Sequence, residues 1–172
     1  MVDTKEGIKR RKSLALVALN KLNDIWENQK ITIKSKSKIF NSTIKPIFLY
    51  NSELWALSNS EENQIDSFQR RLFIHKMARK ISTENLKEKL NFKPWSLEIK
   101  RRRLSWCGHL LRLPEGCPAK EALSLCEEHT RTNRSKQVTW LQVVKKQLIE
   151  LNVNWEYAKE RAMDREEWNK LF

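Results

Sequence analysis

Large apolar residues recur every three or four positions along most of the chain, which is the spacing of amphipathic helices. The first such segment runs from Glu6 to Asn28 and has a strongly basic polar face. The second follows Thr32, whose hydroxyl suits an N-cap, and contains Pro46, which is expected to kink or split the helix. The two apolar stripes are Ile8, Ala15, Leu19, Leu22 and Trp26, and then Ile39, Phe40, Ile44, Ile47 and Phe48.

The same spacing continues through the middle of the chain. A third helix begins near Ser58, which has the capping-box relation to Glu61, and extends to about Lys80. A short helix over 82–90 follows, and the next helix begins after Pro94, a residue suited to the first helical position. The apolar stripe of the third helix is Ile65, Phe68, Leu72 and His75.

Turn residues and caps divide the last part of the chain. Prolines and a glycine at 114–118 end one helix, and a short helix over 119–126 precedes a polar, exposed loop over 127–137. Another helix follows, and Asn154 is expected to cap the last one. Their stripes are Val138, Leu141, Val144, Leu148 and Leu151, and then Trp155, Ala158, Ala162 and Trp168. These patterns predict an all-α fold of seven or eight helices. The chain's three glycines are too few for a protein rich in hairpins.

The chain carries a large excess of positive charge. It has 34 Lys and Arg against 21 Asp and Glu, for a net charge of +13. Such an excess attracts polyanions, of which nucleic acid is the commonest and an acidic membrane surface the other candidate. No stretch approaches the roughly 20 apolar residues of a membrane span. The segment from Lys9 to Leu22 imitates a signal peptide, but no small-residue cleavage site follows it, so we favour a helix of the mature protein.

The cysteines and histidines raise the question of metal binding. Cys107, His109, Cys117, Cys126 and His129 lie within a short segment, but without the paired ligand spacing of most zinc sites. Cys107 and His109 would lie about 200° apart around a helix, so both can hardly reach one ion. We favour Cys107 and Cys126 as small apolar packing residues, and a metal-dependent enzyme remains an alternative. An odd number of cysteines without repeated spacing predicts no disulfide framework, which favours a reducing interior such as cytosol or nucleus.

The sequence contains no recognisable catalytic centre. It has no Gly-rich phosphate loop, no G-x-S-x-G and no H-E-x-x-H motif. The acidic pairs are typical of helix ends or surface charge. His75 lies on an apolar stripe and is expected to be a core histidine rather than a catalytic one. We therefore expect no enzymatic activity from this chain by itself and no cofactor.

Four consecutive basic residues, Lys100 to Arg103, stand in the segment "IKRRRLSWCGHLLRLP". On a helix these positions sweep about 300°, so they cannot all face one way. A seam of leucines at 97, 104 and 111 places Arg101 near the core, whereas Arg102 and Arg103 are expected to lean outwards and meet phosphate. The alternative is that these are solvated flanks whose stems cover the core. Trp95 and Trp106 could stack on a base, although core packing is the favoured role.

Several motifs together resemble one family. "RRRLSWCGHLLRLP" resembles the R-R-R-L-x-W-x-G-H signature that follows the polymerase core in LINE-type (non-long-terminal-repeat) retrotransposon reverse transcriptases. "IFNSTIKPIFLYNSELWAL" resembles the family's earlier F-x-S-x-hydrophobic-x-P and L-Y-G-x-E-x-W stretch, with Asn51 in place of the usual Gly. The stretches "DTKEGIKRRKSLALVALNKLNDIW" and "WLQVVKKQLIELNVNWEYAKERAMDREEWNKLF" resemble the basic helix before it and the tail after it. The catalytic Tyr/Phe-x-Asp-Asp motif, the fingers and the palm are absent.

The resemblance implies a thumb-like bundle over 1–57 and a post-thumb helical region over 58–172, as a fragment or truncated open reading frame without polymerase activity. It implies a segment that holds template–primer, element RNA or target DNA through electrostatic contacts to the nucleic-acid backbone. The expected location is inside the cell, in nucleus or cytoplasm, and no membrane partner is expected. A helical module that binds a protein partner is the alternative. The expected nucleic-acid contacts are Lys9, Arg10, Arg11, Lys12, Lys100, Arg102, Arg103, Arg131, Arg134 and Lys136.

Overall fold

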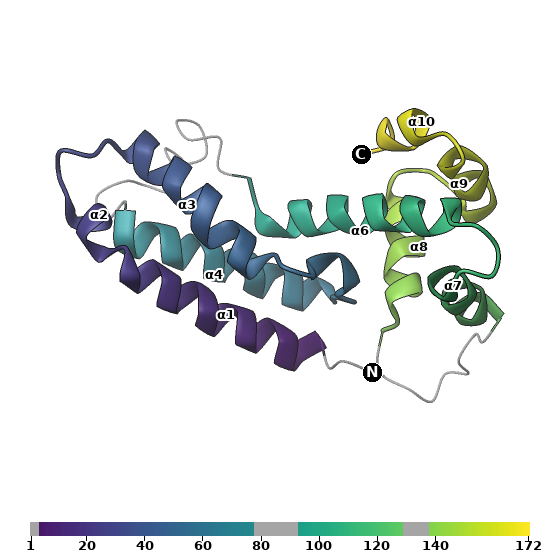
Figure 1. Cartoon of the computed structure of the whole chain (residues 1–172), viewed down its shortest axis with the longest axis horizontal. Helices are drawn as coiled ribbons and strands as arrows, with labels where there is room; N and C mark the ends of the chain where they lie inside the picture. The colour runs from purple at the N-terminus through teal and green to yellow at the C-terminus, as the bar shows by residue number, and fades with distance from the viewer. Residues whose placement is uncertain (1–3, 78–92, 129–137) are drawn as a thin grey trace. The chain divides into compact units, whose positions relative to one another are not determined.

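In a computed structural model, the structure describes residues 4–77, 93–128 and 138–172, with the side chains of 75–77 excepted. This part of the chain forms α-helices and one short 3-10 helix, with no strand, which confirms the all-α prediction (Figure 1). None of the described helices is both long and apolar enough to span a bilayer. The helices are α1 (Thr4–Lys21), α2 (Asn23–Glu27), α3 (Ile33–Phe48), η1 (Ser52–Leu54), α4 (Asn59–Met77), α6 (Trp95–Arg112), α7 (Pro118–Glu128), α8 (Trp140–Glu150), α9 (Trp155–Ala162) and α10 (Arg165–Asn169).

The helices belong to two compact units. Unit 1 comprises Met1–Asn51 and Ser60–Glu98, and unit 2 comprises Ser52–Asn59 and Ile99–Phe172. The long helix α6 therefore contributes its first turn to unit 1 and the rest to unit 2. This grouping puts 60–98 with the N-terminal helices, whereas the family resemblance places a boundary at 57. The assignment of 1–57 as thumb-like and 58–172 as post-thumb stays a prediction.

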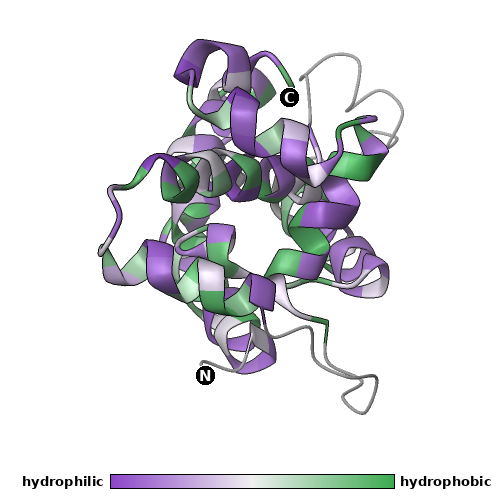
Figure 2. Ribbon diagram, turned by 90° about the vertical axis from the view of Figure 1, so that its right-hand side faces the viewer, coloured by the Kyte–Doolittle hydropathy of each residue, from purple (hydrophilic) through white to green (hydrophobic). Residues whose placement is uncertain are grey.

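Unit 1 is held together by an aromatic core. Helix α1 packs against α3, and the ring of Phe48 stacks on Trp95 with centroids 4.6 Å apart. Phe40 meets Phe73 edge-on at 5.4 Å, and Phe68 packs on Phe48 at 5.5 Å. These side chains come from the apolar stripes of α3, α4 and the first turn of α6. Figure 2 shows hydrophobic and hydrophilic segments alternating along the helices, as amphipathic packing requires.

The first two predicted helices differ in detail from the structure. The segment expected to be one helix to Asn28 breaks after Lys21 into α1 and α2, and Trp26 donates its indole N–H to the Leu19 carbonyl oxygen at 2.7 Å. Thr32 caps α3 as predicted, accepting from the Ser35 N–H at 3.2 Å. The helix is not split at Pro46, because it continues through this residue to Phe48.

Unit 2 packs α7, α8, α9 and α10 around the C-terminal part of α6. Trp168 donates its indole N–H to the Leu104 carbonyl oxygen at 2.9 Å, which ties α10 to α6. Asn154 caps α9 as predicted, accepting from the Tyr157 N–H at 2.8 Å. The predicted last helix is two helices, because Asp164 accepts N–H bonds that begin α10 separately. The helix expected over 82–90 lies outside the described residues. The loop expected over 127–137 also lies outside them, except for Glu127 and Glu128, which the structure places in the last turn of α7.

Candidate nucleic-acid interface

The basic run of α6 is largely part of the fold. Arg103 is 0% exposed, and its Nε donates to the Trp55 carbonyl oxygen at 3.1 Å. The expectation that Arg103 leans outwards to meet phosphate is therefore wrong. The physical reason is the rotation of α6 about its own axis, which decides which of its side chains face the core. Leu97 is 56% exposed, whereas Ile99, Arg103 and Cys107 are fully buried. The buried face of α6 therefore includes Arg103 as well as Leu104 and Leu111 of the leucine seam.

The neighbours of Arg103 are also engaged within the fold. Lys100 forms an ion pair with Glu150 at 3.4 Å. Arg101, expected near the core, is exposed, and Arg102 is half-buried, and both take part in further interactions of the fold. Arg112, at the end of the same motif, donates to the Ala162 carbonyl oxygen at 2.7 Å and so holds the C-terminal end of α9. The run thus serves packing first.

The tryptophans beside the run belong to the two cores. Trp95 is buried within the aromatic cluster of unit 1, which confirms the favoured packing role. Trp106 is partly buried against the core of unit 2 and lies 5.1 Å from the ring of His109. Trp95 therefore presents no face for stacking on a base.

The basic cluster of α1 has a different environment. Lys9 and Arg10 are exposed, and the guanidinium of Arg11 lies 4.3 Å from the centre of the Tyr50 ring. The ammonium of Lys12 lies 5.6 Å from the centre of the Phe68 ring. Among the residues that the structure describes, no carboxylate forms an ion pair with any of these four cations. Their charges are therefore available to an external anion, with cation–π contacts holding two of them in place.

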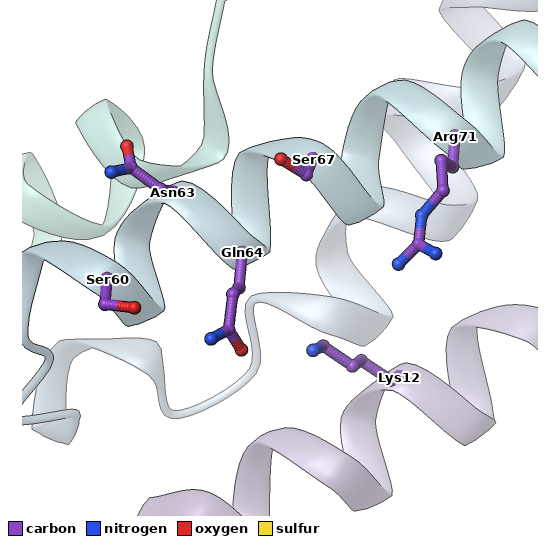
Figure 3. Close-up of a pocket in the computed structure, with 6 residues that line it drawn as sticks. All are labelled: Lys12, Ser60, Asn63, Gln64, Ser67 and Arg71. Carbon is purple, nitrogen blue, oxygen red and sulfur yellow. The ribbon is translucent and has the colours of Figure 1, made fainter.

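Lys12 shares an open pocket with one face of α4. The pocket has a volume of about 520 Å³. Lys12 and Gln64 extend towards each other across it, and Arg71 extends from α4 into the space between the two helices (Figure 3). We call this the α1–α4 groove. Its lining consists of Lys12, Ser60, Asn63, Gln64, Ser67 and Arg71.

The α1–α4 groove combines two cations with neutral polar groups, and none of its described lining residues is acidic. Ser60, Gln64, Ser67 and Arg71 follow one another at helical spacing, so they form a polar row along a single face of α4. Arg70 borders the row and donates to the Ser67 hydroxyl at 3.1 Å. Hydroxyl, amide and cationic groups in this arrangement suit an anionic, hydrogen-bonding ligand.

The sequence predicts only one of the two cations of the α1–α4 groove. Lys12 is among the contacts expected from the sequence, whereas Arg71 is not. The signal that marks it is the row of small polar residues ahead of Arg71 on an otherwise amphipathic helix. Nothing local in the sequence says that this row faces Lys12, because the two segments meet only in the fold. The expected contacts Arg131, Arg134 and Lys136 lie outside the described residues.

The cysteines have separate environments. Cys107 is buried in the core of unit 2, and burial, followed by the charge of Glu127, raises its pKa to about 12. The packing role expected for Cys107 is confirmed, because a thiol with so high a pKa stays protonated and apolar. The same expectation is wrong for Cys126, which is exposed at the surface of α7. In the described ranges, no three metal-ligating side chains gather in one place, and His129 lies outside those ranges.

Comparisons with known proteins found no relative of this chain. No protein-family model matches the chain, and neither the curated proteins nor the solved structures contain a match. The likeness to LINE-type reverse transcriptases thus rests on the sequence motifs alone and stays a prediction.

Proposed function

We propose that this chain is a nucleic-acid-binding segment of the retrotransposon reverse-transcriptase type, which holds the sugar–phosphate backbone and has no polymerase site of its own. The observation that supports it best is the position of the available cations. Lys9, Arg10 and Lys12 on α1, with Arg70 and Arg71 on α4, form no ion pair with a carboxylate of the described residues. In contrast, the run on α6 is engaged by packing and by Glu150.

The mechanism is electrostatic. Each Lys or Arg that neutralises a duplex phosphate releases condensed counterions, so affinity falls by about 0.9 log units per log unit of salt for each contact. Contacts to phosphate position the strand and carry no direct sequence information. Binding should therefore depend steeply on salt and weakly on sequence. Template–primer, element RNA and target DNA are the expected partners, inside the cell in nucleus or cytoplasm.

A salt titration with paired variants tests this proposal. Binding of the whole chain to a labelled duplex is measured between about 50 and 200 mM salt, where such complexes weaken strongly. The double variant Lys9→Met with Arg10→Met, at two exposed positions of α1, should bind more weakly and lower the salt slope by about 2 × 0.9. The matched variant Lys100→Met removes a cation that is paired with Glu150 and should leave the slope nearly unchanged. No binding at low salt, or a flat salt dependence, would contradict the proposal.

A protein-binding helical module is the second candidate. The observation that favours it is a set of exposed apolar side chains on α1, where Leu14, Leu16 and Val17 are 40%, 42% and 54% exposed. Exposed leucines and valines grouped on one helix are typical of partner-binding surfaces. A salt-insensitive interaction that is lost in Leu14→Ser with Val17→Ser, while nucleic-acid binding is absent, would favour this function.

A further inference from the structure

We infer that the α1–α4 groove binds the backbone of a single RNA strand, with Lys12 and Arg71 on phosphate and the amide and hydroxyl groups of α4 on the ribose 2′-hydroxyls. The inference rests on the proposed function and adds the chemical class of the ligand. It follows from the size of the groove, the placement of its charges and the hydrogen-bonding capacity of its neutral residues.

The dimensions favour one strand. The ammonium of Lys12 on α1 lies 5.6 Å from the centre of the Phe68 ring on α4, so side chains of both helices border the groove. The volume of about 520 Å³ falls within the roughly 300–1,000 Å³ of pockets that enclose small ligands. A single strand can lay one or two nucleotides in such a space.

The two cations approach this space from different helices. Lys12 extends from α1 and Arg71 from α4 (Figure 3). A phosphodiester oxygen accepts hydrogen bonds and carries negative charge, so an ammonium and a guanidinium on either side match it. Arg71 adds a planar fork of donors, and Lys12 adds a mobile point charge. Neither cation is paired with a carboxylate among the described residues.

The neutral residues point to RNA. Asn63 and Gln64 offer carbonyl oxygens, and Ser60 and Ser67 offer hydroxyl oxygens, all of which can accept a hydrogen bond. The backbone of DNA has no donor to give to these acceptors. The backbone of RNA has one donor per nucleotide, the 2′-hydroxyl, which is the group by which proteins distinguish RNA from DNA.

The length of the row also fits an extended strand. From Ser60 to Arg71 the row covers 11 residue steps of α4, or about 16 Å at 1.5 Å per residue. None of the lining side chains that the structure describes is aromatic. Bases therefore have no stacking surface inside the groove, and the contact is made by the backbone without regard to sequence.

Matched oligonucleotides test the inference directly. Fluorescence anisotropy of the whole chain is measured with labelled 12-mers of uridine, of deoxyuridine and of 2′-O-methyluridine. The uridine 12-mer should bind about fivefold or more tightly than the deoxyuridine 12-mer, which is the effect expected from one net hydrogen bond. The 2′-O-methyl strand has no 2′ donor and should bind like the deoxyuridine strand.

Variants assign the effect to the groove. Arg71→Met should weaken binding of both strands, whereas Gln64→Met should reduce the preference for uridine and leave the salt slope unchanged. Lys38→Met removes an exposed lysine of α3 outside the groove and serves as the matched control. Circular dichroism checks that each variant keeps its helices.

Two results would overturn the inference. One is equal affinity for the uridine and deoxyuridine strands, and the other is an Arg71→Met effect no larger than that of Lys38→Met. In either case a steep salt dependence of binding would still support the proposed function. Absence of any nucleic-acid binding at low salt would contradict both the inference and the proposed function.

Discussion

Replacing Gly108 by alanine tests how tightly unit 2 is packed. Gly108 lies within α6, and a Cβ atom there would overlap Nε1 of Trp168 and stand 2.6 Å from its Cδ1. The indole cannot easily move aside, because Trp168 is 1% exposed and its Nε1 donates to the Leu104 carbonyl oxygen. The close approach of α10 to α6 therefore depends on the missing side chain at position 108.

Opposing effects decide how much Gly108→Ala changes the free energy of unfolding. Alanine is a better helix former than glycine by about 1 kcal/mol. Overpacking of a core costs about 1–3 kcal/mol, and displacing the indole from its carbonyl partner adds about 1 kcal/mol. The clash exceeds the propensity gain, so Gly108→Ala should lower the free energy of unfolding by about 1–3 kcal/mol.

Urea denaturation followed by tryptophan fluorescence and circular dichroism measures this change. Gly7→Ala is the matched control, because Gly7 also lies in a helix and an added Cβ there meets nothing within 4 Å. The control should be neutral or stabilised by up to about 1 kcal/mol. Combining Gly108→Ala with Trp168→Leu should cost less than the sum of the two single changes. Equal stability of Gly108→Ala and the parent chain would refute the packing argument.

Three further predictions concern a turn, a cap and a thiol. Asn51 has φ of 58°, so Asn51→Val should destabilise unit 1 by about 1 kcal/mol or more in thermal melts, while Asn51→Gly should not. Asp164 accepts N–H bonds from Glu167 and Glu166 that lower its pKa, so its stabilising effect is present above its usual pKa and fades as pH falls through the lowered value. Asp164→Asn should reduce this acid sensitivity in melts between pH 2 and pH 5, and an unchanged profile would contradict it. Iodoacetamide at pH 8 should modify exposed Cys126 and spare Cys107 in the folded chain, and mass spectrometry that found both labelled equally would contradict its burial.

The sequence by itself determined the helical elements and their caps. Apolar spacing of three or four residues and capping side chains such as Thr32 and Asn154 act within one or two turns, so they can be recognised without tertiary structure. The positive charge was equally plain from composition. Where one apolar pattern could be divided in two ways, as at Lys21 or Asp164, local rules gave one helix and the fold made two.

Only the tertiary structure decided which cations face solvent and which face the core. In α6, Ile99 and Leu97 are both apolar, and packing buries Ile99, which turns Arg103 inwards towards the Trp55 carbonyl. The α1–α4 groove likewise brings Lys12 to Arg71 across a long separation in sequence. The physical reason is that local hydrogen bonding sets helical periodicity, whereas the rotation of each helix about its axis depends on the distant side chains against which it packs.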